Sequence, residues 1–162
     1  MDPCPCTIWP TSATPAGSAN DPNAVELGVR LRSDVSGSIT GLRFYKGAAN
    51  TGIHVANLWT NAGVLLATAT FTGETASGWQ TVNFPTPVPI TANTTYVASY
   101  HTNAGQYAYS SLFFASAGVD SAPLHALRTN VDGSNGVYLY GASGFPSETY
   151  NSTNYWVDVV FK

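Results

Sequence analysis

The sequence has few charged residues: Asp, Glu, Lys and Arg make up 9% of its 162 residues, and Lys46 and Lys162 are the only lysines. Cytosolic proteins usually stay soluble through charge, whereas this chain is rich in Thr, Ser, Asn, Gly and Ala. We therefore expect a secreted, extracellular protein. The net charge of −3 argues against nucleic acid as a partner, because phosphate binding needs clustered Lys and Arg.

The chain also lacks a long hydrophobic run. No stretch approaches the roughly 18 apolar residues of a membrane-spanning helix, so we expect no membrane insertion. The start, Met1-Asp2-Pro3-Cys4, has neither the basic region nor the apolar region of a signal peptide. We expect the chain to be a mature or excised segment of a larger protein.

Two cysteines are present, Cys4 and Cys6. A zinc site would need further thiols or histidines at ligand spacing, and none lie nearby in sequence. The sequence leaves open whether the pair forms a disulfide or two free thiols.

Motifs that mark common enzymes are missing too. We find no G-x-S-x-G nucleophile turn and no glycine-rich phosphate loop with its lysine. The acidic residues are scattered singly, mostly beside turn residues, whereas glycosidases need two carboxylates that face each other. The sequence therefore predicts no catalytic residues and a non-enzymatic function.

Alternating apolar and polar residues indicate strands throughout. Val25, Leu27, Val29 and Leu31 alternate with polar or small residues, which predicts a strand with one polar face. Similar runs cover 38–45, 53–59, 64–71, 78–84, 94–101, 137–140 and 155–161. Prolines after residue 84 are typical of an edge strand or crossover. One helical turn is expected at 124–127.

These patterns predict an all-β fold, an antiparallel β-sandwich or jelly roll of about 8–10 strands with little or no helix. Residues 1–24, rich in Pro, Ser and Thr and containing both cysteines, are expected to form an N-terminal lead-in segment. Residues 25–162 are expected to form a single domain, and we expect a monomer.

Several strings resemble a bacterial domain-of-unknown-function family of large secreted multidomain proteins, where immunoglobulin-like and polysaccharide-active modules are neighbours. The strings are Asn20-Asp21-Pro22-Asn23, Val25-Glu26-Leu27-Gly28-Val29, Ile39-Thr40-Gly41-Leu42-Arg43-Phe44-Tyr45-Lys46-Gly47, Thr95-Tyr96-Val97-Ala98-Ser99-Tyr100-His101, Pro123-Leu124-His125-Ala126-Leu127 and Asn154-Tyr155-Trp156-Val157-Asp158-Val159. The resemblance implies an extracellular accessory module of β-sandwich type, with the other domains of a larger protein as partners. It implies no activity and no binding residues.

Aromatic residues in the less regular second half suggest a binding site. Trp and Tyr rings can stack on the C–H face of a sugar while amide and imidazole groups bond its hydroxyls. The predicted ligand-binding residues are His101, Tyr107, Tyr109, His125, Asn135, Tyr138, Tyr140 and Tyr150. The alternative is that these aromatics only fill a sandwich core. We expect recognition of a polysaccharide or other glycan, the alternative being a structural or adhesive spacer domain.

A metal-dependent enzyme is the third hypothesis. His54, His101 and His125 could converge at one end of the sandwich and form a zinc or copper site, with His101 and His125 as the favoured pair. The alternative is that each histidine bonds a loop carbonyl. We expect no required cofactor.

A structural calcium ion is a further candidate, because sandwich loops can supply oxygen ligands. The available residues are Asn20, Asp21, Asp34, Asp120, Asp132 and Asp158. Asp158 interrupts an apolar run, so it is either exposed or buried with partners.

Overall fold

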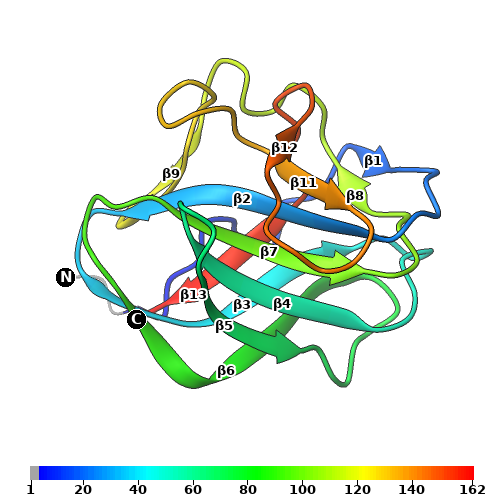
Figure 1. Cartoon of the computed structure of the whole chain (residues 1–162), viewed down its shortest axis with the longest axis horizontal. Coiled ribbons are helices and arrows are strands. Elements are labelled where there is room, and N and C mark those ends of the chain that lie inside the picture. Colours follow the sequence, from blue (N-terminus) through cyan, green and yellow to red (C-terminus); the bar gives the residue numbers. More distant parts are fainter. Residues whose placement is uncertain (1–3) are drawn as a thin grey trace.

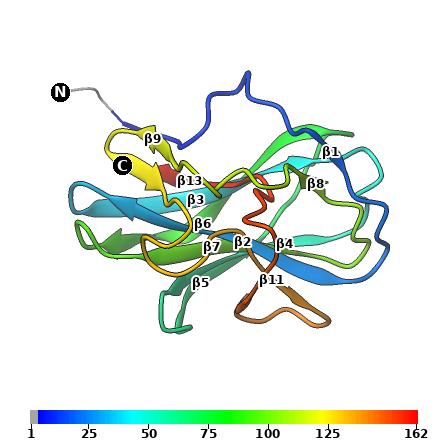
Figure 2. The same ribbon diagram turned by 90° about the horizontal axis from the view of Figure 1, so that it is seen from above.

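The computed structural model describes residues 4–162; Met1, Asp2 and Pro3, which carry the expectation about the start of the chain, lie outside the described residues. Two antiparallel sheets pack face to face (Figures 1 and 2). The predicted class, an all-β antiparallel sandwich, is confirmed. No helix occurs in residues 4–162, so this part of the chain holds no helical membrane span.

Thirteen strands are described. They are β1 (Gly17–Ser18), β2 (Val25–Ser33), β3 (Gly37–Lys46), β4 (His54–Thr60), β5 (Leu65–Thr70), β6 (Gly78–Ile90), β7 (Tyr96–Thr102), β8 (Ala108–Tyr109), β9 (Val119–Ser121), β10 (Leu124–Ala126), β11 (Val137–Tyr140), β12 (Glu148–Thr149) and β13 (Val157–Phe161). The larger sheet has the order β12-β11-β2-β7-β4-β5, with β10 also on β2 and β9 on β10; the smaller is β13-β3-β6, and β1 pairs with β8.

The core lies between the two sheets. Val25, Leu27, Val29 and Leu31 of β2 are all at most 1% exposed, which follows from the alternation of the strand. From the smaller sheet, Phe44 stacks on Tyr100 of β7 with ring centroids 4.2 Å apart. Burial of each such side chain contributes about 1.5–3 kcal/mol.

The outer face of β2 is less exposed to solvent than the polar residues in its sequence suggest. Glu26 is fully buried there and accepts hydrogen bonds from the side chains of Ser99, Asn57 and Ser143. Ser143 belongs to the loop between β11 and β12, which covers this face. Burial raises the pKa of the Glu26 carboxyl, and the three donors partly offset that effect.

The N-terminal segment packs against the smaller sheet. Ile8 and Trp9 are buried in the core cluster, and Cys6 forms a backbone bridge with Phe161. Cys4 and Cys6 are joined by a disulfide, which answers the question left open by the sequence. The two ends of the described chain thus lie together, whereas β1 and β8 lie at the opposite end (Figures 1 and 2).

Two local predictions were wrong. The expected helical turn at 124–127 is instead β10, which pairs with both β2 and β9, because β2 offers free backbone partners there. The strand expected to end at residue 84 continues to Ile90. Its prolines are tolerated because β6 is an edge strand, as they suggested.

Candidate functional site

Six of the nine tyrosines line one groove, which consists of two adjoining cavities of about 250 and 260 Å³. Tyr107, Tyr150 and Tyr155 line both cavities. The first is completed by Val25, Leu27, Tyr138 and Tyr140. The second is completed by Ala19, Asn20, Asp21, Tyr109, Ser111 and Thr153. We call this feature the tyrosine groove.

The groove exists because the smaller sheet does not cover the whole inner face of the larger one. On β11, Tyr138 is opposite Leu27 of β2 and Tyr140 is opposite Val25, so both rings project on the core-facing side. The smaller sheet has three strands and the larger has eight. Loops carrying Tyr107 and Tyr155 cover this margin instead of strands, and they leave a hollow.

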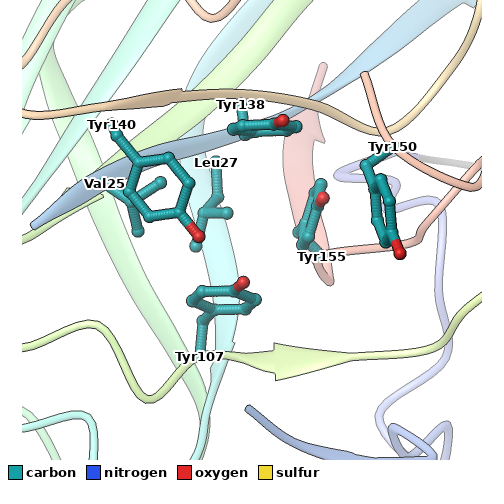
Figure 3. Close-up of a pocket in the computed structure, with 7 residues that line it drawn as sticks. All are labelled: Val25, Leu27, Tyr107, Tyr138, Tyr140, Tyr150 and Tyr155. Carbon is teal, nitrogen blue, oxygen red and sulfur yellow. The ribbon is translucent and has the colours of Figure 1, made fainter. Parts of the chain in front are cut away.

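Four rings enclose the first cavity: Tyr107, Tyr138, Tyr140 and Tyr155, which we call the tyrosine box. Figure 3 shows them around a central space with Val25 and Leu27 between them. Neighbouring rings are nearly perpendicular, at 73° for Tyr138–Tyr140, 75° for Tyr138–Tyr155 and 81° for Tyr107–Tyr155. The corresponding centroids are 5.6, 6.4 and 5.6 Å apart. Such edge-to-face contacts hold the rings in place.

Asp21 supplies a carboxylate next to the box. Its backbone is fixed to Gln106, whose N–H donates to the Asp21 carbonyl at 2.7 Å and whose Oε1 accepts from the Asp21 N–H at 3.0 Å. Asn23 donates two hydrogen bonds to Oδ1, and the Tyr140 hydroxyl donates to Oδ2. Burial alone would raise the pKa of Asp21, but the bonds from Tyr140 and Asn23 outweigh it and lower the pKa. The carboxylate is therefore ionised at neutral pH.

Three phenols of the box, those of Tyr107, Tyr140 and Tyr155, stay protonated at neutral pH. The hydrogen bond to Asp21 raises the pKa of Tyr140, and burial raises the pKa of Tyr107 and of Tyr155. Each hydroxyl can thus donate and accept a hydrogen bond. Among the residues that line the groove there is no Lys, Arg or His, so its formal charge comes from Asp21.

Five of the eight predicted binding residues meet in this groove: Tyr107, Tyr109, Tyr138, Tyr140 and Tyr150. His101 lies close by on the other face of the larger sheet, where its Nε2 is 2.7 Å from the Gly141 carbonyl. His125 and Asn135 lie elsewhere.

Asn135 fills a gap in the larger sheet. β11 pairs with the first part of β2 and β10 with the last part, so Arg30 between them has no strand partner on this side. The Asn135 side chain accepts from the Arg30 N–H at 2.8 Å and donates to the Arg30 carbonyl at 3.1 Å. It also donates to the Leu127 carbonyl. Asn135 thus replaces a missing strand residue, and its side-chain amide is engaged with the backbone.

The three histidines do not converge, so the geometry required by the third hypothesis is absent from residues 4–162. His101 is opposite Glu26 of β2 and His125 is opposite Arg32, so they are separated by about 20 Å along that strand. His54 is buried, with Nδ1 2.9 Å from Glu74 and Nε2 2.8 Å from Asn50. The register of the antiparallel strands fixes where each residue lies along its neighbour, so His101 and His125 cannot approach each other.

The candidate calcium ligands are also dispersed. Asp34 and Asp120 both bond His125, Asp132 bonds Thr95, and Asp158 is buried with Arg43. Within residues 4–162, no group of three or more His, Cys, Asp or Glu side chains could hold a metal ion.

Sequence reasoning missed Tyr155 as a groove residue and considered Asp21 only for calcium. Tyr155 was assigned to the last strand, but β13 begins at Val157, and Trp156 has a positive φ of 60° that interrupts the alternation. The rings at 107, 109, 138, 140 and 150 were found because they cluster in irregular sequence.

The fold and the groove define a β-sandwich domain with an aromatic, tyrosine-lined hollow at its margin. The family model described as Domain of unknown function (DUF4082) matches residues 12–157, and the chain belongs to this family. No curated protein matches the chain.

Proposed function

We propose that the protein is a non-catalytic extracellular recognition module that binds a carbohydrate in the tyrosine groove. The observation that carries the proposal is the convergence of six tyrosines with the polar side chains of Asn20, Ser111 and Thr153. Aromatic faces suit the C–H face of a pyranose, and hydroxyl and amide groups suit its hydroxyls.

The expected affinity is modest. Stacking a sugar on one ring buries on the order of 100 Å² of apolar surface, a gross gain of about 2.5 kcal/mol. Two stacked sugars gain about 5 kcal/mol before the cost of association is subtracted, so we expect a dissociation constant of about 1 mM or weaker. Such weak sites suffice where several modules act together on one polymer.

The setting we propose is a larger secreted protein, with this domain as an accessory monomer beside flanking domains. The Cys4–Cys6 disulfide supports an oxidising, extracellular location, as does the low content of charged residues. Flanking domains joined at the paired ends would leave the groove at the far end of the sandwich open.

Binding without catalysis is favoured by the composition of the groove. Asp21 is the single carboxylate among the described residues that line it. Glycosidases generally place two carboxyl groups on either side of the bond that they cleave. The tyrosine hydroxyls act as hydrogen-bonding groups.

The test is a binding screen of the domain against insoluble polysaccharides by pull-down and soluble glycans by affinity electrophoresis, with calcium and with chelator. Tyr150→Ala removes a groove ring that is 63% exposed, and Ile53→Ala, also at a 63% exposed side chain, is the matched control outside the groove. We expect retention by one glycan class, weakened by Tyr150→Ala and unchanged by Ile53→Ala.

Failure to retain any glycan in either condition would overturn the carbohydrate proposal. The alternative of a structural or adhesive spacer domain would then be favoured. An equal loss of glycan retention in Tyr150→Ala and Ile53→Ala would show that the screen reports on the stability of the domain and not on the groove.

A further inference from the structure

The shape of the tyrosine box is more specific than a stacking surface for a sugar. A stacked sugar needs an open ring face, whereas three neighbouring ring pairs of the box stand at 73°, 75° and 81° around a small space (Figure 3). The volume of this cavity, about 250 Å³, suits a compact substituent more than a whole oligosaccharide. The apolar side chains of Val25 and Leu27 complete its lining.

An enclosure of aromatic faces attracts cations. The face of each ring is negative, so a cation between several rings is stabilised on all sides, and substituted ammonium groups also gain from contact with apolar surface. A hydrated inorganic cation would lose its water without oxygen ligands to replace it. The chemistry of the lining therefore favours an organic ammonium.

The electrostatics of the neighbourhood point the same way. The ionised carboxylate of Asp21 accepts from Tyr140, a member of the box, and lines the adjoining cavity. The hydrogen bonds between Asp21 and Gln106 fix it there before any ligand arrives. No cationic side chain of the described groove lining competes for it.

We propose that the tyrosine box binds a substituted ammonium group carried by the ligand, with Asp21 as its counter-charge. This inference rests on the proposed function in taking the tyrosine groove as the binding site, and it adds the chemistry of one substituent. Two sources share that chemistry: the primary ammonium of an amino sugar, and a quaternary ammonium of the choline type linked to a polymer.

The first experiment compares choline chloride with neohexanol, its uncharged carbon isostere, by following amide chemical shifts during titration. We expect choline to bind at least about tenfold more tightly, because a desolvated cation–π contact contributes about 2 kcal/mol or more. The shifted amides should include those of 138–140 and 155. Equal binding of the two compounds, or of neither while neutral glycans bind, overturns the inference and leaves the proposed function standing.

Two variants test the roles of the ring faces and of the charge. Tyr138→Leu keeps an apolar side chain but removes a π face, and we expect choline binding to fall about fivefold or more. Asp21→Asn removes the charge with little change in shape, and we expect a threefold to fivefold loss. Ile53→Ala is the control outside the groove. Loss of choline binding in the control as well would contradict a role of the box.

The second experiment distinguishes the two sources. Chitosan oligosaccharides carry primary ammonium groups, whereas chitin oligosaccharides of equal length carry neutral acetamido groups on the same backbone. Preference for chitosan that disappears in Asp21→Asn supports the amino-sugar source. Equal affinity for the two oligosaccharides together with selective choline binding supports the quaternary source. Retention of chitin alone would contradict the binding of an ammonium group and leave the proposed function standing.

Discussion

The Asp158 carboxylate lies 2.6 Å from the Arg43 guanidinium, and both side chains are buried on the outer face of the smaller sheet. The same carboxylate accepts from the backbone N–H groups of Ile8 and Trp9, and Arg43 donates to the Trp9 carbonyl. This ion pair therefore attaches the N-terminal segment to the sandwich.

The first prediction concerns this pair. Asp158→Asn leaves a buried guanidinium without its counter-charge, so we expect a loss of about 3–5 kcal/mol in the free energy of unfolding. Denaturant titration measures it. In the exposed pair Arg32–Asp132, Asp132→Asn should cost about 1 kcal/mol or less. Equal losses in the two variants would contradict the role given to burial.

The second prediction concerns the gap between β10 and β11. Asn135→Ala removes the acceptor of the Arg30 N–H and the donor to two carbonyls, all in the sheet interior. Each buried group left unpaired costs about 1–3 kcal/mol, so a total loss of about 2–4 kcal/mol is expected. Thermal or chemical unfolding would show it. Asn103→Ala, at an exposed loop position, should change stability by about 0.5 kcal/mol or less.

A third prediction links a glycine to the groove. Gly105 has a positive φ of 61°, and a β-carbon there would lie 1.9 Å from the Asp21 carbonyl oxygen. Gly73 has nearly the same φ, 63°, with open space around it. Gly105→Ala should therefore lose about 1–3 kcal/mol more stability than Gly73→Ala. It should also weaken choline and glycan binding by displacing Asp21. Identical behaviour of the two variants would show that the contact between Gly105 and Asp21 is unimportant.

The fourth prediction concerns two histidines with opposite responses to pH. Burial lowers the pKa of His54 below 6.5, so its stabilising contribution is present above pH 6.5 and is lost as pH falls through its folded pKa. For His125, burial acts to lower the pKa, but the hydrogen bonds to Asp120 and Asp34 outweigh it and raise the pKa. Its contribution is present below pH 6.5 and is lost as pH rises through its folded pKa.

The measurement is the unfolding free energy of wild type minus that of each variant across pH. For His54→Asn this difference should shrink between about pH 7 and pH 5, and for His125→Asn it should shrink between about pH 6 and pH 8. A difference that shrinks in the same pH direction for both variants would contradict the assignment.

The strand pattern was readable in β2 because Val25, Leu27, Val29 and Leu31, which alternate in the sequence, are the residues that face the core. It failed where backbone pairing decided the structure: residues 124–126 form a strand because β2 has free hydrogen-bonding groups beside them, which no local pattern records. The sheet-completing role of Asn135 could not be predicted, because an amide that completes a sheet and an amide that binds sugar look alike in sequence.

The groove was partly readable for a similar reason. Tyrosines clustered in the less regular second half of the chain indicated the site, but Asp21 is held beside them by long-range hydrogen bonds with Gln106. Contacts between residues 85 positions apart depend on the whole topology. The sequence alone does not place the Asp21 carboxylate at the site, so the ammonium inference depends on the structure.

Part of the groove wall comes from segments outside the long strands: the loop before β2, the stretch from Tyr107 to Ser111, and the turn before β13. Because loops change more freely than the sheets that carry them, each of these segments can vary while the sandwich stays intact. Ligand preference is thus encoded in part outside the strands that build the fold. Among family members, a shared framework can therefore evolve new specificities by substitutions at a few wall positions.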